Sequence, residues 1–79
     1  MEPVQIKMAR AALGWGVRDL AAKAGVTANT VTRIENGADM RQSTMTAIQR
    51  AIEAAGIELI PENGSGPGVR LAKRTSEPA

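Results

Sequence analysis

The chain has 79 residues, a formal net charge of +2, no cysteine and no histidine. A chain of this length suits one small domain, which buries only ~60% of the surface that its unfolded form exposes. Without cysteine or histidine the sequence cannot form a disulfide, the usual zinc sites or a Ser-His-Asp or Cys-His catalytic arrangement. We therefore expect no catalytic residues, no metal and no cofactor.

Neither a membrane span nor a secretion signal is predicted. The longest apolar runs, such as Leu59–Ile60, are far shorter than the roughly 20 residues of a transmembrane helix. The N-terminal stretch begins with Glu2 and Pro3 and is interrupted by Lys7 and Arg10, unlike a signal peptide. Because the absence of cysteine also suits a reducing compartment, we expect a cytoplasmic protein with no membrane partner.

The first predicted helix runs from Pro3, which suits a first helical turn, to about Leu13. Apolar residues recur at offsets of three and four and define one inward face, made of Ile6, Ala9 and Leu13. Gln5 is expected to lie largely outside that face. Gly14 and Gly16 flank the single aromatic residue, Trp15, and end the helix.

Two short helices follow, one over roughly residues 17–24 and one that begins after Thr27 and stops at Asn36–Gly37. Asp19 suits the positive end of the first of them. Gly25 fits the left-handed conformation that ends a helix, and Thr27 can cap the next one. The inward positions of the pair are Leu20, Ala21, Ala24, Val31 and Ile34.

A loop over residues 38–42 leads to a fourth helix, with Ser43 as its expected N-cap and Gly56 as its stop signal. The inward stripe of this helix is Met45, Ile48, Ile52 and Ala55. Beyond Gly56, residues 57–60 and 69–72 look like short extended segments separated by a turn-rich stretch. A β-hairpin is possible, although the loop is long for one.

The expected fold class is therefore all-α, a compact four-helix domain with a short extended or β-hairpin C-terminal segment. Residues 1–56 form the predicted helix-turn-helix domain, residues 57–72 an extended segment that is a possible dimerisation arm, and residues 73–79 a polar tail expected to be disordered.

In a helix-turn-helix, the second helix projects its N-terminal side chains into the major groove of DNA. The outward residues at that position are the candidate base readers Ala28, Asn29, Thr32 and Arg33. Asn pairs bidentately with adenine and Arg with guanine, each pair giving ~1–3 kcal/mol of discrimination, while Ala and Thr methyl groups contact a thymine methyl. Arg33 could equally form a surface ion pair with Asp39.

The order and spacing of apolar, small and glycine positions resemble the Cro and lambda-repressor-like helix-turn-helix family, also called the XRE family. The resemblance spans IKMARAALGW, DLAAKAGVTANTVTRIENG and the ST-AI pattern of the fourth helix, roughly residues 4–56. The ending GIELIPENGSGPGVRLAK is similar to that of small one-domain bacterial members. The resemblance implies a sequence-specific regulator that binds double-stranded DNA, most often a repressor that occupies its operator.

The resemblance also assigns roles to individual positions. The family's base readers match Ala28, Asn29 and Arg33, with Thr32 as a neighbouring contact. Candidate contacts to DNA phosphates, which set register but read no sequence, are Arg18, Thr30, Asn36 and Arg41. In many members an arginine of the first helix pairs with a glutamate near the end of the recognition helix, and Arg10 and Glu35 match this structural ion pair.

One departure from the family concerns the start of the second helix. Members usually place a Ser or Thr cap there, followed by a Gln that contacts the DNA backbone, whereas this chain has Gly16 and Val17. One expected DNA anchor is therefore absent. Trp15 is expected to pack between the first, second and fourth helices, because single-strand binders generally use several aromatic residues.

The segment after Gly56 is too apolar for a free tail. It either covers its own fourth helix or pairs with a second chain by strand addition. The dimerisation candidates are Ile57, Leu59, Ile60, Val69 and Leu71. The expected partners are DNA and a second copy of the chain; the alternative is a protein-interaction module, such as an antitoxin whose C-terminal segment binds a partner protein.

Overall fold

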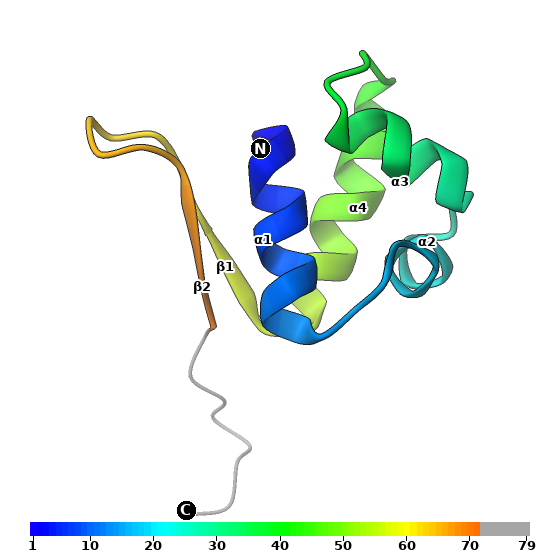
Figure 1. Ribbon diagram of the computed structural model, residues 1–79, viewed down its shortest axis with the longest axis horizontal. Coiled ribbons are helices and arrows are strands. Elements are labelled where there is room, and N and C mark those ends of the chain that lie inside the picture. Colours follow the sequence, from blue (N-terminus) through cyan, green and yellow to red (C-terminus); the bar gives the residue numbers. More distant parts are fainter. Residues whose placement is uncertain (72–79) are drawn as a thin grey trace, which may run out of the picture.

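The computed structural model describes residues 1–71, which form four helices followed by a two-stranded antiparallel hairpin (Figure 1). In chain order the elements are α1 (Pro3–Leu13), α2 (Val17–Ala24), α3 (Ala28–Glu35), α4 (Gln42–Ala54), β1 (Ile57–Ile60) and β2 (Gly68–Leu71). The predicted four-helix fold with a short C-terminal segment is confirmed, and the segment is a hairpin. The predicted disordered tail, residues 73–79, lies outside the described residues.

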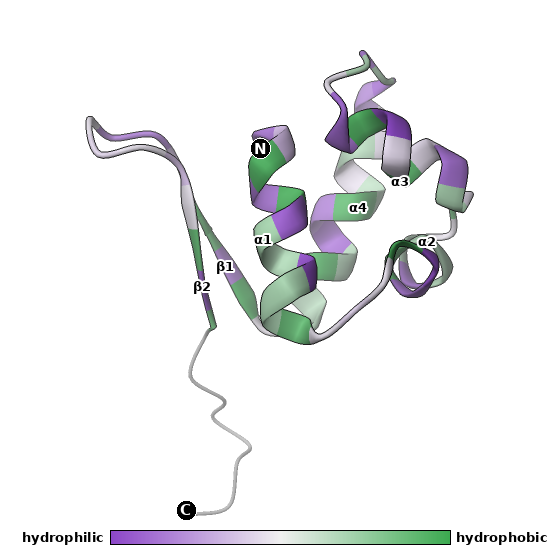
Figure 2. Cartoon of the chain, viewed as in Figure 1, coloured by the Kyte–Doolittle hydropathy of each residue, from purple (hydrophilic) through white to green (hydrophobic). Residues whose placement is uncertain are grey.

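The core of the described residues is aliphatic, as a chain without Phe or Tyr requires. Its buried apolar side chains are Ile6, Ala9, Leu20, Ala21, Val31, Ile34, Ile48, Ile52 and Ile57. Hydrophobic and hydrophilic positions alternate along each helical ribbon, which is typical of helices that bury one face (Figure 2). Ile57 belongs to β1, so the hairpin shares the core of the helices. Trp15 is half-buried and packs against this core, beside Lys23 of α2 and Ala51 of α4.

The turn between α2 and α3 has the predicted chemistry. Gly25 adopts the left-handed conformation, with a φ of 73°, and its N–H donates to the carbonyl of Ala21. Thr27 caps α3, because its Oγ1 accepts from the N–H of Thr30 at 3.1 Å. These two residues close one helix and open the next within three positions, which fixes the crossing of α2 and α3.

The start of α4 differs from the prediction. The N–H of Thr44 donates to the carbonyl of Arg41 at 3.0 Å, so the first turn closes from Arg41 and the helix begins at Gln42. Ser43 therefore lies inside the first turn and is not the N-cap. Arg41 occupies the cap position without a side-chain hydrogen bond to the helix.

The hairpin closes despite its long loop because the loop has its own hydrogen bonds. The strands pair from Ile57 opposite Leu71 to Ile60 opposite Gly68. Within the loop, Oε2 of Glu62 accepts from the N–H of Gly64 at 2.8 Å and of Gly66 at 3.0 Å. Both glycines have a positive φ, 98° and 96°, which residues with a side chain rarely adopt.

Gln5 joins the hairpin to α1, and its expected position outside the inward face is wrong. Gln5 is only 2% exposed. Its Nε2 donates to the carbonyls of Ile60 and Gly68, both at 2.9 Å, and its Oε1 accepts from the N–H of Glu2 at 2.6 Å. A polar side chain is buried here because each end of the amide has a backbone partner.

We expect Gln5→Leu to lower the free energy of unfolding by about 1–3 kcal/mol, since the carbonyls of Ile60 and Gly68 lose a buried donor. Urea denaturation followed by circular dichroism measures the change. The matched control is Gln42→Leu, which removes an exposed amide that bonds Thr46 at 3.2 Å. Equal losses of stability in the two variants would contradict the role assigned to Gln5.

Candidate nucleic-acid interface

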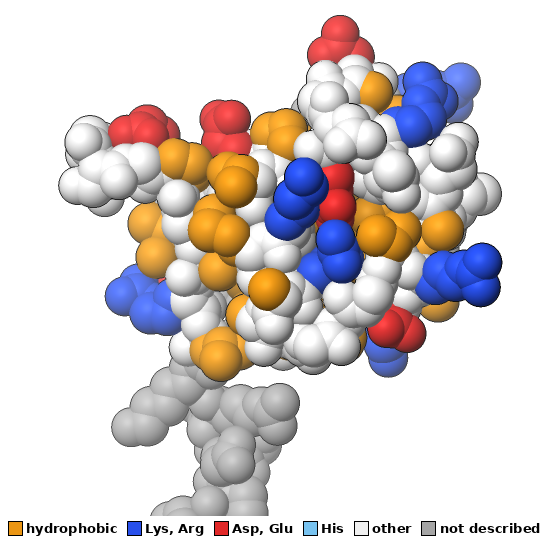
Figure 3. Space-filling view, viewed as in Figure 1, with side chains coloured by type: hydrophobic (Ala, Val, Ile, Leu, Met, Phe, Trp, Pro, Cys, Tyr) orange, Lys and Arg blue, Asp and Glu red, His pale blue; other side chains and the backbone are white. Residues whose placement is uncertain are grey.

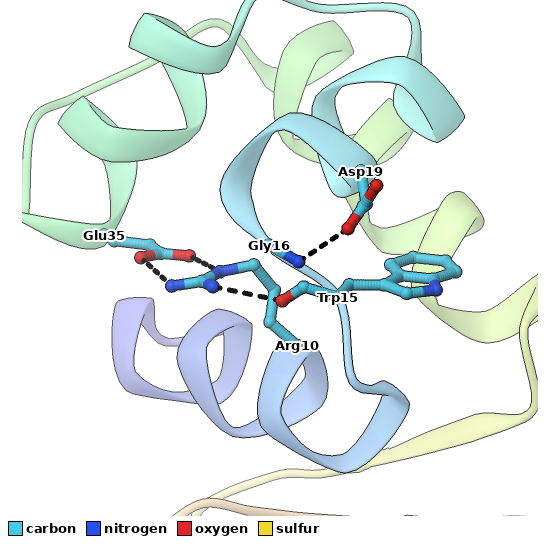
Figure 4. Close-up of polar contacts among 5 residues, drawn as sticks. All are labelled: Arg10, Trp15, Gly16, Asp19 and Glu35. Atoms are coloured by element: carbon cyan, nitrogen blue, oxygen red, sulfur yellow. Dashed lines mark hydrogen bonds and ion pairs between the residues drawn. The ribbon is translucent and has the colours of Figure 1, made fainter.

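The end of α3 is held by an ion pair with α1 (Figure 4). Nε of Arg10 lies 2.7 Å from Oε2 of Glu35, and Nη2 lies 2.9 Å from Oε1, so the contact is bidentate. The side chains are 21% and 5% exposed. Hydrogen bonding to the Glu35 carboxylate raises the pKa of Arg10 above its ordinary value. The structure thus brings together the two residues expected to pair. Their contact joins the C-terminal end of α3 to α1.

The same guanidinium also fixes the approach to α2. Nη1 of Arg10 donates to the carbonyl of Trp15 at 3.2 Å. The next residue, Gly16, donates its N–H to Oδ2 of Asp19 at 2.8 Å (Figure 4). The N-cap residue of α2, Gly16, has no side chain that could accept a hydrogen bond from the helix. The carboxylate of Asp19 instead supplies a side-chain hydrogen bond at the start of α2. Val17 is half-buried and packs against the core, which explains an apolar residue at a position where a glutamine is usual.

Three of the four candidate base readers project from α3. Asn29, Thr32 and Arg33 are exposed, and within residues 1–71 their side chains make no hydrogen bond or ion pair. Ala28 is half-buried and packs partly against the core. The alternative ion pair between Arg33 and Asp39 is not formed. The exposed face of α3 therefore presents one amide, one hydroxyl and one guanidinium that have no polar partner among residues 1–71.

The candidate phosphate contacts lie around this helix. Arg18 is exposed in the first turn of α2, and Arg41 is exposed at the N-cap of α4. Asn36 is exposed at the C-cap of α3, but its N–H is occupied by carbonyls of the last turn, so only its side chain is available. The hydroxyl of Thr30 lies 2.9 Å from that of Thr27. When Thr27 is the donor of this hydrogen bond, the Thr30 hydroxyl keeps its own proton to donate to a phosphate.

The charge of this region is mostly positive. Over residues 17–41 the exposed charged side chains are the cations Arg18, Lys23, Arg33 and Arg41 and the anions Asp19 and Asp39. The carboxylate of Asp19 is hydrogen-bonded to the backbone, and Glu35 is buried against Arg10. An excess of exposed Arg and Lys over this segment suits a partner that carries phosphates.

Within residues 1–71 there is no group of three or more Asp and Glu side chains arranged to hold a metal ion. Among the helices of the same residues, none is long and apolar enough to cross a membrane.

Comparison with known protein families matches residues 4–59 to a family described as a helix-turn-helix domain. The match covers well over half of the chain and extends from α1 into β1. The protein belongs to this helix-turn-helix family, in agreement with the resemblance to Cro-like regulators. A comparison with curated proteins returned no match.

We expect Arg10→Met to lower the free energy of unfolding by about 3 kcal/mol, because it leaves the Glu35 carboxylate buried without its partner. Equilibrium urea unfolding measures the loss. Arg50→Met, which removes an exposed arginine of α4, serves as the control and should change stability by less than about 0.5 kcal/mol. A similar small effect at Arg10 would show that the ion pair does not anchor α3.

Proposed function

We propose that this protein is a sequence-specific regulator of transcription that binds double-stranded DNA in the cytoplasm. In this proposal it acts as a repressor by occupying its operator as a homodimer, without catalytic activity. The recognition helix is α3. Asn29, Thr32 and Arg33 read bases, Ala28 lines the contact with a methyl group, and phosphates are bound by Arg18, Arg41 and the side chains of Thr30 and Asn36.

One observation carries the proposal. Asn29, Thr32 and Arg33 have no intramolecular polar partner within the described residues, although they lie on a helix that is fixed at both ends. Thr27 caps its start and the ion pair of Glu35 holds its end. Because these side chains are free while their backbone is rigid, binding DNA requires little reordering of the helix.

A protein-interaction module, for example an antitoxin, is the second candidate function. It is favoured by Val17, whose side chain cannot form a hydrogen bond to a phosphate, and by the small net charge of +2. The polar outward face of α3 supports the DNA-binding proposal more strongly, because an interface with a protein partner is usually more apolar at its centre.

Selection of bound sequences from random duplex DNA tests the proposal. We expect one motif to be enriched by the unmodified protein. Asn29→Ala should relax the preference at an adenine, and Arg33→Ala at a guanine, each by about 5- to 150-fold, because each removes a bidentate pair worth ~1–3 kcal/mol. Failure to enrich any motif at low salt rejects the proposed function, whereas a motif unchanged in both variants rejects only the assigned readers.

Phosphate contacts are tested by the salt dependence of binding. Arg18→Ala and Arg41→Ala should each weaken binding to all sequences and reduce the slope of log K against log salt by about one. Arg50→Ala removes an exposed arginine outside the proposed interface and should leave the slope unchanged. Fluorescence anisotropy over a salt series measures DNA binding by the three variants. An equal change of slope in Arg50→Ala would mean that Arg18 and Arg41 act only through the net charge of the protein and not through phosphate contacts.

A further inference from the structure

The tripeptide Glu-Asn-Gly occurs twice in the chain, at residues 35–37 and at residues 62–64. An asparagine before a glycine is susceptible to deamidation, because the glycine has no side chain that hinders attack by its backbone nitrogen on the asparagine side chain. Asn36 and Asn63 are both exposed, and the glycine that follows each has a positive φ, 91° and 98° respectively. The two sites therefore match in sequence, in exposure and in the backbone conformation of the glycine.

The glutamate of the first site is engaged elsewhere. Both carboxylate oxygens of Glu35 accept hydrogen bonds from Arg10, at 2.7 and 2.9 Å, and the side chain is only 5% exposed. The N–H of Gly37 donates instead to the carbonyl of Ile34, at 2.9 Å. The nitrogen that would attack the asparagine is thus held by a neutral acceptor, which does not take up a proton.

The glutamate of the second site reaches the backbone of its own loop. Oε2 of Glu62 accepts from the N–H of Gly64 at 2.8 Å and from that of Gly66 at 3.0 Å. The first of these nitrogens is the one that would attack Asn63. A carboxylate oxygen at hydrogen-bond distance is placed to remove the proton of that nitrogen, as a general base does. The attacking nitrogen is therefore paired with a base before any reaction begins.

The loop also holds the group that is attacked. Oδ1 of Asn63 accepts from the N–H of Ser65 at 3.3 Å. Negative charge develops on this oxygen when the neighbouring carbon is attacked, and a donor in this position stabilises it. The loop projects away from the helices (Figure 1), and Figure 3 shows an acidic side chain at its surface. Water therefore has access to the site.

We propose that Asn63 is a site of intramolecular deamidation, with Glu62 as its general base. The nitrogen of Gly64 forms a bond to Cγ of Asn63 while its proton passes to Oε2 of Glu62. The bond from Cγ to Nδ2 then breaks, and Nδ2 takes the proton from Glu62 and leaves as ammonia. Water opens the resulting succinimide at one of its two carbonyls, which gives aspartate or isoaspartate at position 63. The net reaction consumes one water and releases one ammonia, without oxidation or reduction.

The modification changes both the charge and the length of the loop. The formal net charge falls by one, from +2 to +1. In the isoaspartate product the main chain runs through the side-chain carbons of residue 63, so the loop is longer by one atom. The loop lies on the far side of α1 from α3 (Figure 1), so the modification does not alter the proposed recognition helix. The inference is therefore independent of DNA binding.

The reaction is followed on the full chain, incubated at neutral pH and sampled over weeks. Cleavage after lysine and arginine places the two asparagines in separate peptides, residues 34–41 and 51–70. Mass spectrometry measures each conversion, because aspartate and isoaspartate are heavier than asparagine. We expect Asn63 to convert at least about tenfold faster than Asn36, since a positioned general base contributes roughly 10²–10⁴ in rate.

Glu62→Gln tests the base. The oxygen of the new amide can still accept the loop N–H groups but is not a base, so conversion of Asn63 should slow at least about tenfold. The matched control is Glu53→Gln, which removes the same charge at an exposed position of α4 and should leave the rate unchanged. Asn36 serves as an internal reference and should convert equally in all three proteins. Circular dichroism checks that the variants keep their helices.

Unfolding separates the effect of the fold from that of the sequence. In urea neither glutamate is held in place, so the two asparagines should convert at similar rates. A preference for Asn63 that persists in urea overturns the proposal, as does a folded chain in which Asn63 converts no faster than Asn36. If Glu62→Gln converts as fast as the unmodified chain or faster, the loop hydrogen bonds only restrain Asn63, and Glu62 is not its base. Equal slowing in Glu53→Gln also rejects this role.

Discussion

The geometry of the helix-turn-helix depends on the partly buried contact between Arg10 and Glu35. Both oxygens of the carboxylate receive an N–H of the guanidinium, and the third bond from Arg10 reaches the carbonyl of Trp15. One side chain of α1 thereby positions the end of α3 and the loop that enters α2. The Glu35 carboxylate, only 5% exposed, tolerates little displacement, because losing a bond to Arg10 leaves one of its oxygens unpaired away from water. The contact therefore specifies an orientation that aliphatic packing alone would leave less defined.

The same helix carries a second polar anchor on another side. Gln5 precedes Arg10 by five positions, which places the two side chains about 140° apart around α1. Gln5 holds the hairpin, whereas Arg10 holds α3. The aliphatic residues of α1 point into the core between them. The hairpin and α3 are consequently fixed to different sides of one helix.

The sequence predicts the features that depend on neighbouring residues, such as helices and turns. It does not predict the contacts that depend on residues far apart in the chain. Apolar periodicity, Gly25 and Thr27 located the helices and the central turn, because each acts within a few residues. Gln5 was misplaced because its partners are carbonyls more than 50 positions away, and a polar residue in isolation indicates an exposed site. The sequence alone does not distinguish a hairpin from a single extended segment, because the role of Glu62 in the loop follows only from the folded backbone. The assignment of Asn29, Thr32 and Arg33 as base readers stays a prediction, which depends on their exposed positions on α3.

The start of α2 shows how one position can serve either stability or recognition. Val17 packs against the core, and Asp19 bonds the N–H of Gly16, so this turn is satisfied within the protein. A glutamine at position 17 would keep its amide in water and offer it to a phosphate, at the expense of that apolar contact. The chain has the packing contact instead. Within residues 1–71, the exposed side chains of Asn29, Thr32 and Arg33 on α3 make no hydrogen bond or ion pair, and the proposed reading of bases depends on them.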